Sequence, residues 1–341
     1  MESNKLVLRG TTSYFETVDS EVSQRMEEGG LVFLNMPLPV GCNYDCLKCF
    51  SGGSDIYNEQ LRQRGVTAEF DSDLRERLVR DAFDIGARTI VIAGAGEPLI
   101  YSGLDEILGL TGRLGMSTVV FTNGFHLSKE KAESLFSNGA SIFFSYDSTT
   151  PGNYDAVTQT TGNHDIVRAN LEATLDLSEQ YSITREEHKI VPFGVNTNPT
   201  RFTYNPETGV DEIKEISDLV FGRAAHFVSH ITPSGNAEHN WELLTGRRDG
   251  NLNFQLKQAE LIYGSGIGGS SRRKNGSCAY VYNGVTVYEG YYMPCPNAGL
   301  KIDFGRYPEV SLSDHLDSKK RMMMEANNPL CITRKEETSK Q

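Results

Sequence analysis

The segment LVFLNMPLPVGCNYDCLKCF, residues 31–50, joins a mostly apolar run to a loop that carries three cysteines. The run is apolar enough for a buried strand, and Cys42, Cys46 and Cys49 follow it in a C-x3-C-x2-C spacing. Thiolates placed this close together hold iron–sulfur clusters or zinc. Zinc would need a fourth Cys or His, and the nearest histidine along the chain is His126. The spacing therefore favours an iron–sulfur cluster.

Composition and charge limit the class of protein. The chain has 341 residues, 38% of them hydrophobic and 23% charged, which predicts a packed core large enough for one α/β domain with an appendage. A net charge of −12 argues against nucleic-acid binding, and we interpret the basic run at 272–274 as a solvated loop. We find no membrane-length apolar run and no secretory signal in MESNKLVLRG. We therefore expect a cytoplasmic protein with no membrane partner, in which clustered cysteines bind metal more often than they form disulfides.

Apolar runs alternate with helical patterns over most of the chain. Such alternation predicts an α/β fold with a parallel sheet, whose functional loops follow the carboxyl ends of the strands. Ser102 followed by Asp105 resembles a capping box that opens one of the helices. The pattern alone leaves open whether the sheet closes into a barrel. Strands are predicted at 31–38, 88–96, 117–124, 140–148, 189–198 and 225–235, and helices at 71–87, 102–114, 126–139, 164–179 and 211–222.

Short polar motifs follow the predicted strands in a fixed order. Phe50 comes directly after the cysteine triplet, and a Gly-Glu-Pro sequence follows the second strand. Together with the C-x3-C-x2-C loop, this ordered set resembles the radical S-adenosylmethionine (radical SAM) superfamily over residues 31 to about 240. The later motif residues, one or two to a strand end, are Asn123, Ser145, Asp147, Asn196 and Ser234.

The resemblance implies a partial (βα)6 TIM-like barrel and a specific chemistry. Cys42, Cys46 and Cys49 would hold a 4Fe–4S cluster whose open iron binds S-adenosylmethionine, and an external donor such as flavodoxin or ferredoxin would supply the electron. Reductive cleavage would give a 5'-deoxyadenosyl radical that removes a hydrogen atom from the substrate. The motif residues that would contact the cofactor are Phe50, Gly96, Glu97, Pro98, Asn123, Ser145 and Asp147 (both near the ribose), Asn196 and Ser234 (near the adenine). For most of them ordinary turn or capping bonds are the alternative.

A second cysteine triplet, Cys278, Cys295 and Cys331, lies beyond this region. The spacing resembles the SPASM or twitch module that holds an auxiliary 4Fe–4S cluster, although the usual closing run of cysteines is reduced to Cys331. Unrelated buried thiols, or a free hydrogen-atom donor, are the alternatives. We expect a β-hairpin over 277–299 that turns at Asn283-Gly284. The domain hypothesis is an N-terminal extension (1–30), a radical SAM partial barrel (31–250) and a twitch-like module (255–341).

The favoured substrate is a polar small molecule, such as a sugar, an aminocyclitol or a related metabolite, that is oxidised or epimerised. The residues before the first cysteine are few for a leader-binding domain, so a maturase of a ribosomally made peptide is the second hypothesis. A non-catalytic iron–sulfur electron carrier is the third, but a carrier needs no cofactor cradle. His226 and His230 share one face of the sixth predicted strand, where they would be substrate binders or structural histidines.

Overall fold

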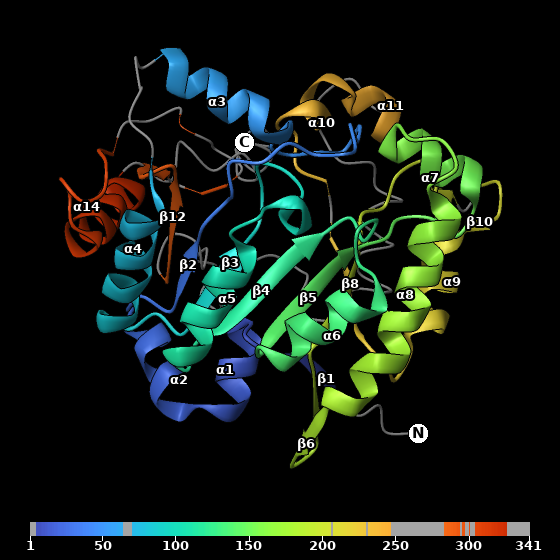
Figure 1. The fold of residues 1–341 in the computed structure, drawn as a ribbon. Coiled ribbons are helices and arrows are strands. Elements are labelled where there is room, and N and C mark those ends of the chain that lie inside the picture. Colours follow the sequence, from blue (N-terminus) through green and yellow to red (C-terminus); the bar gives the residue numbers. More distant parts are fainter. Residues whose placement is uncertain are drawn as a thin grey trace.

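The computed structural model describes residues 5–63, 70–205, 207–229, 231–246, 283–293, 295–296, 300 and 304–325. Its main sheet has eight strands in the order β11-β8-β5-β4-β3-β2-β12-β13 (Figure 1). The α/β class and the parallel sheet of a partial barrel are confirmed, and β11 and β13 are the edges of this sheet in the described part of the chain. The six predicted strands pair in parallel as β2 (Phe33–Asn35), β3 (Thr89–Ile92), β4 (Ser117–Thr122), β5 (Ala140–Ser145), β8 (Phe193–Thr197) and β11 (Ala225–Val228).

The predicted helices connect these strands. Three of them begin at side-chain caps: Asp71 accepts from the backbone N–H of Leu74, Ser128 from that of Lys131, and Asp211 from that of Lys214. The capping box predicted at Ser102 is wrong, because the helix there begins after Gly103 without a side-chain cap. The connecting helices are α4 (Ser72–Asp84), α5 (Leu104–Arg113), α6 (Lys129–Ser137), α8 (His164–Ser178) and α9 (Glu212–Val220).

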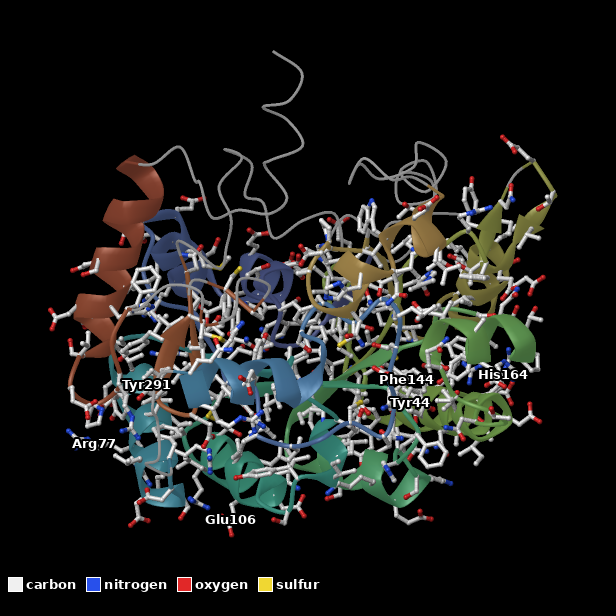
Figure 2. All side chains as sticks on the ribbon, turned by 90° about the horizontal axis from the view of Figure 1, so that it is seen from above. Tyr44, Arg77, Glu106, Phe144, His164 and Tyr291 are labelled. Atoms are coloured by element: carbon white, nitrogen blue, oxygen red, sulfur yellow. The ribbon has the colours of Figure 1, made fainter. Side chains whose placement is uncertain are left out.

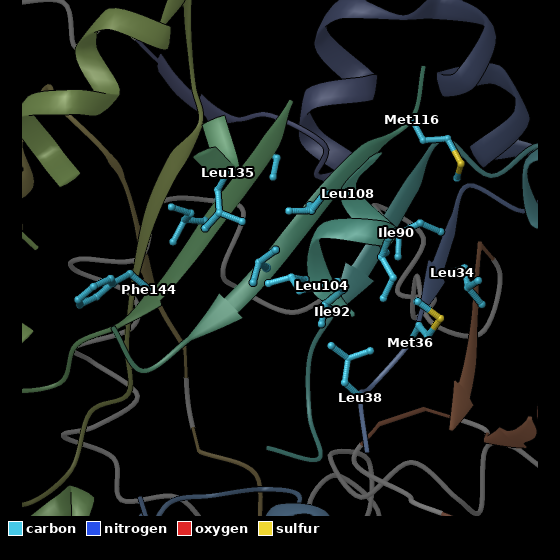
Figure 3. Close-up of a cluster of buried hydrophobic side chains, with 14 of the residues drawn as sticks. Leu34, Met36, Leu38, Ile90, Ile92, Leu104, Leu108, Met116, Leu135 and Phe144 are labelled. Atoms are coloured by element: carbon cyan, nitrogen blue, oxygen red, sulfur yellow. The ribbon is translucent and has the colours of Figure 1, made fainter. Parts of the chain in front are cut away.

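The main core lies between the sheet and its covering helices. Leu34 and Met36 from the β2 segment, Ile90 from β3, and Leu104 and Leu108 from α5 belong to one buried cluster, which Figure 3 shows on one side of the strands. Since side chains alternate along a strand, the residues between these positions point to the other face of the sheet. We call that other side the inner face.

The fifth predicted strand is two strands. Pro192, which has no backbone N–H to donate to a ladder, separates β7 (His188–Val191) from β8. β7 leaves the main sheet and forms a second sheet with β1 (Lys5–Leu8) and β6 (Ile183–Arg185). The apolar pattern ran across the proline, so the sequence showed one strand where the chain changes sheet.

The remaining elements are short or peripheral. None of the described helices is long and apolar enough to cross a membrane. These elements are α1 (Thr12–Val18), α2 (Ser20–Glu27), α3 (Gly53–Gln63), η1 (Pro98–Ile100), α7 (Pro151–Thr158), η2 (Glu179–Tyr181), β9 (Tyr204–Asn205), β10 (Val210–Asp211), α10 (Asn236–His239), α11 (Trp241–Thr245) and α14 (Leu312–Glu325).

The C-terminal hairpin does not turn where the sequence predicts. Its strands are β12 (Gly284–Tyr288) and β13 (Tyr291–Met293), and the turn is Glu289-Gly290, with φ of 49° and 81°. Gly284 is instead the first residue of β12. A Cβ at this position would lie 2.2 Å from the Phe33 ring, which explains why the residue is glycine. β12 pairs in parallel with β2, so Figure 1 shows this segment (orange) beside the first strand of the barrel (blue). Residues 277–282 lie outside the described part, and the three-part domain division stays a prediction.

Asn283 joins this segment to the N-terminal region. Its buried side-chain amide donates to the carbonyls of Met26 and Gly30 at 3.0 Å each. Two distant parts of the chain therefore meet at one amide group, and the Asn-Gly pair serves long-range packing rather than a turn.

His226 is a structural histidine of the core. Its Nε2 lies 3.0 Å from the Thr197 hydroxyl and its Nδ1 2.8 Å from the Ser217 hydroxyl, and burial lowers its pKa to about 4. Both ring nitrogens are therefore used within the core, and this geometry does not support the hypothesis that His226 binds substrate. His230 lies outside the described residues.

We expect Asn283→Ala to lower the free energy of unfolding by about 1–3 kcal/mol, because it removes a buried hydrogen bond to the Met26 carbonyl and a partly buried one to the Gly30 carbonyl. Urea denaturation provides the measurement. The matched control is Asn138→Ala, which removes one exposed amide bond to the Ser134 carbonyl and should cost about 0.5 kcal/mol or less. Equal losses in the two variants would contradict the anchoring role.

His226 also predicts a pH dependence of stability. The unfolded chain takes up a proton on this histidine near its ordinary pKa of 6.5, whereas the folded chain does so only near pH 4. Stability is therefore complete above pH 6.5 and falls as the pH drops below it, by roughly 2 kcal/mol between pH 6.5 and 5. We expect His226→Gln to lose less stability than the wild type over this range in urea titrations. Parallel losses would show that His226 does not titrate as described.

Candidate functional site

The three-cysteine loop leaves β2 at the carboxyl edge of the parallel sheet. Cys42 is exposed, and Cys46 and Cys49 are half-buried. Removal of its sulfur from bulk water raises the pKa of Cys42 to about 11, and burial also raises the pKa of Cys46; mutual repulsion among the three thiols adds to both shifts. Binding to a metal centre would lower the pKa of these thiols, because a thiol that coordinates a metal is deprotonated.

The three thiols lie on one short loop. Among the residues that the structure describes, no three His, Cys, Asp or Glu side chains form a site for one metal ion. An iron–sulfur cluster presents a separate iron to each thiolate, so the sulfurs need not converge on one point. Three neighbouring thiols on one short loop suit such a cluster.

The Gly-Glu-Pro loop that follows β3 packs directly on the cysteine loop. A Cβ on Gly96 would lie 2.1 Å from the carbonyl oxygen of Val40, so only glycine permits this approach. The preceding Ala95 has a φ of 65°, which is a strained conformation for a residue with a side chain. The backbone N–H of Glu97 donates to the carbonyl of Gly41 at 3.1 Å.

The carboxylate of Glu97 joins this loop to the end of β4. It is buried, and it accepts from the Thr122 hydroxyl at 2.7 Å and from the Asn123 backbone N–H at 2.8 Å. It also accepts from the backbone N–H of Leu99 at 3.1 Å, beside Pro98, the first residue of η1. Burial raises the pKa of Glu97, and these three donors oppose that shift by stabilising the carboxylate.

Asn123 extends the connection to the first cysteine. Its side-chain amide donates to Asn43 Oδ1 at 2.8 Å and lies 3.8 Å from the sulfur of Cys42. Its Oδ1 accepts from the backbone N–H of Phe125, which fixes the amide orientation. The position of Cys42 is therefore set by β4 as well as by its own loop.

The ends of β5 and β8 reach the same loop through Lys48, which lies between Cys46 and Cys49. Lys48 Nζ is 2.5 Å from the buried carboxylate of Asp147 and 2.9 Å from Asn198 Oδ1. The other oxygen of Asp147 accepts from the backbone N–H of Asn198 at 2.7 Å. Both oxygens of Asp147 are thus used within the protein. Lys48 is not among the site residues predicted from the sequence, although it lies inside the cysteine motif.

Ser145 and Asn196 are half-buried and lie opposite each other in the ladder between β5 and β8. The Asn196 Oδ1 accepts from the Ser229 hydroxyl at 2.9 Å, and its amide donates to Asn198 at 3.2 Å. These two residues therefore share one face of the sheet at its carboxyl edge.

The loop after β11 closes on the cysteine loop from the other side. The Ser234 hydroxyl donates to the carbonyl of Phe50 at 2.9 Å. A Cβ on Gly235, whose φ is 58°, would lie 2.6 Å from the carbonyl oxygens of Cys49 and Phe50. Asn236 adds amide bonds to Asp45 at 2.9 Å and to the Cys46 carbonyl at 3.2 Å.

Tyrosines support the cysteine loop on the side of α7. Tyr44, between Cys42 and Cys46, is buried, and its hydroxyl lies 3.2 Å from that of Tyr154. Tyr154 in turn packs edge-on against His164, with ring centroids 5.5 Å apart, and Figure 2 shows Tyr44 on the same side of the molecule as His164. Tyr291, from the C-terminal hairpin, lies on the opposite side.

The structure brings together the first triplet and the strand-end motifs, but it leaves the second triplet untested. Cys295 is half-buried and follows β13, next to Pro296, whose carbonyl accepts from Tyr57 of α3 at 2.5 Å. Cys278 and Cys331 lie outside the described residues. The auxiliary cluster therefore stays a prediction.

Part of the chain matches a known family. The Radical SAM superfamily sequence model matches residues 36–177. An S-adenosylmethionine-dependent nucleotide dehydratase from Flammeovirga pacifica is 30% identical over 97 residues, which cover 28% of this chain and 32% of that protein. An Fe-coproporphyrin III synthase from Methanosarcina barkeri is 29% identical over 100 residues, 29% of this chain and 23% of that protein. The matched segments thus span a third or less of these relatives.

Solved structures share the fold. Streptococcus suis SuiB bound to S-adenosylmethionine superposes with a TM-score of 0.56 at 17% identity, covering 93% of this chain and 71% of SuiB. The anSMEcpe structure with bound AdoMet and a Cp18Cys peptide has a TM-score of 0.57 at 14% identity, covering 86% of this chain and 81% of that one. The matched residues 36–177 include the cysteine loop, Glu97 and the end of β5, and this part of the chain is a match to the Radical SAM superfamily.

Proposed function

We propose that this protein cleaves S-adenosylmethionine reductively and removes a hydrogen atom from a polar small molecule, which is thereby oxidised or epimerised at a carbinol carbon. The observation that carries the proposal is the meeting of the three-cysteine loop with the Gly-Glu-Pro loop and the ends of β4, β5 and β8 at one edge of the sheet. An electron carrier would need the thiols but not this surrounding cradle.

Cys42, Cys46 and Cys49 would hold the 4Fe–4S cluster, with one iron left for the cofactor. When bound, the cluster supplies the electron that cleaves S-adenosylmethionine, and superfamily members obtain that electron from an external reductant. The half-buried Ser145 and Asn196, which lie opposite each other at the strand ends, would contact the cofactor, and so would Phe50 beside the last cysteine. A cluster at Cys278, Cys295 and Cys331 remains part of the proposal and would favour oxidation by accepting the second electron.

The chain's own residues would act by holding this site rigid. Glu97 fixes the backbone of Asn123, whose amide side chain reaches Asn43 and the sulfur of Cys42. Lys48 fixes the segment between the other two cysteines to Asp147. Rigid placement matters because hydrogen-atom removal requires the reacting atoms at close approach, and misplacement by about 1 Å costs a hundredfold in rate.

A peptide maturase is the second candidate. Two structures with this fold carry peptides: SuiB bound to its precursor peptide SuiA, with a TM-score of 0.56 at 16% identity and coverage of 90% of this chain and 69% of SuiB, and anSMEcpe with Cp18Cys. At these identities the likeness concerns the fold, so the small-molecule proposal is retained and tested against peptides.

The test is formation of 5'-deoxyadenosine by anaerobically reconstituted protein with dithionite and S-adenosylmethionine. Replacing Cys42, Cys46 and Cys49 by alanine should reduce the product to background. Glu97→Gln should reduce it about tenfold or more, because an amide N–H would face the N–H and O–H donors that now bind the carboxylate.

The matched control is Glu106→Gln, an exposed carboxylate on α5, which should form the product at the wild-type rate. Absence of 5'-deoxyadenosine in the cluster-loaded wild type would contradict the proposal. Deuterium transfer to the product from a labelled polyol, and not from a labelled peptide, would support the small-molecule class. The reverse result would favour the maturase.

A further inference from the structure

Two buried polar side chains on neighbouring strands have no hydrogen-bond partner. Asn35 on β2 is 0% exposed and Thr286 on β12 is 1% exposed. Within the described part of the chain, neither the Nδ2 nor the Oδ1 of Asn35 is bonded, and neither is the Oγ1 of Thr286. The two residues lie directly opposite each other in the parallel pair of β2 and β12. Buried polar atoms in proteins are nearly always satisfied, so this pair requires an explanation.

The pair points to the inner face of the sheet. Leu34 and Met36, which flank Asn35, belong to the cluster on the helix side, as Figure 3 shows. Val285 and Val287, which flank Thr286, belong to the same cluster. Alternation along the strands therefore places Asn35 and Thr286 together on the opposite face.

The neighbours of the pair in register are apolar. Val91 of β3 lies opposite Asn35, and Val119 of β4 lies opposite Val91. Val91 is only half-buried although it is in the middle of the sheet. Among the described residues in register with it, the pair has apolar neighbours and no charged one, since Met293 of β13 lies opposite Thr286.

We propose that Asn35 and Thr286 bind the substrate, and that the group they bind is neutral and both donates and accepts hydrogen bonds. An amide group, or two adjacent hydroxyls, matches the acceptor and two donors of asparagine together with the hydroxyl of threonine. A carboxylate or phosphate does not match, because it has no donor for Asn35 Oδ1 and would meet no cation among the described residues in register with the pair. This inference rests on the proposed function, whose substrate class it defines.

The pair is also well placed along the chain. Asn35 ends β2, and Cys42 follows seven residues later (42 − 35 = 7) on the loop that leaves this strand. A molecule bound at Asn35 would be held by the strand that carries the cysteine loop. β12 lies on the other side of that strand, so the C-terminal segment contributes directly to the site.

The experiment uses the reconstituted protein and observes the side-chain amide of Asn35 by 1H–15N NMR, assigned by its absence in Asn35→Leu. The probes are acetamide, cis-1,2-cyclohexanediol and acetate. We expect both neutral probes to shift the Asn35 signal, with acetamide binding about tenfold or more tightly than acetate. Thr286→Val should weaken acetamide binding severalfold. No shift with either neutral probe, or an equal shift with acetate, would overturn the inference and show that the pair holds water only.

Thermal melting gives a second readout. Asn35→Leu and Thr286→Val each remove an unpaired buried group, so both should melt no lower than the wild type. The matched control is Thr118→Val, because the Thr118 hydroxyl lies 2.8 Å from that of Thr111, and this variant should melt lower while binding acetamide normally. If Asn35→Leu does not fold, Thr286→Val carries the test. Lower melting of Thr286→Val, matching that of Thr118→Val, would show a structural bond and overturn the inference.

The same preparation is assayed for 5'-deoxyadenosine without added substrate. Product without any probe-induced shift would refute the Asn35–Thr286 inference alone. A neutral-probe shift without product would refute the proposed function alone.

Discussion

One buried carboxylate holds the candidate site together. Glu97 receives hydrogen bonds from Thr122 and Asn123 at the end of β4, while its own backbone binds Gly41 at the start of the cysteine loop. A buried carboxylate without donors would be strongly unfavourable, so these bonds and the burial require each other. The bare backbone of Gly96 makes the arrangement possible, since any side chain there would collide with Val40. The geometry of the first cysteine depends on this connection.

A second buried charge fixes the other end of the loop. Lys48 and Asp147 are 10% and 2% exposed, and removing one member of such a pair typically costs about 3–5 kcal/mol because the other is left buried and unpaired. Such a pair is costly to bury and adds little stability over apolar packing. Its value is a defined geometry, because it places the segment between Cys46 and Cys49 against β5 and β8. Glu97 and Lys48 together attach one loop to the ends of four strands.

The sequence predicted the fold well where local patterns decide it. The six parallel strands and the helices that connect them follow from residue spacing. The prediction from the sequence failed where contacts between residues distant in the chain determine the structure. Asn283 and Gly284 have the composition of a turn, yet contacts with Met26, Gly30 and Phe33 place them at a strand start. The roles of Lys48 and Asn35 could not be assigned from the sequence. Lys48 pairs with Asp147 and Asn35 lies opposite Thr286, and both partners are distant in the chain.

The central claim is that Cys42, Cys46 and Cys49 hold the cluster that meets S-adenosylmethionine. It is tested most directly by Mössbauer and EPR spectroscopy of reconstituted wild type and of the variant with all three cysteines replaced by alanine, each with and without S-adenosylmethionine. We predict that the wild type shows a reduced 4Fe–4S signal that changes on addition of S-adenosylmethionine, and that the variant shows no responsive signal. Any cluster retained by the variant would then belong to the second triplet. A variant whose cluster still responds to S-adenosylmethionine would contradict the account.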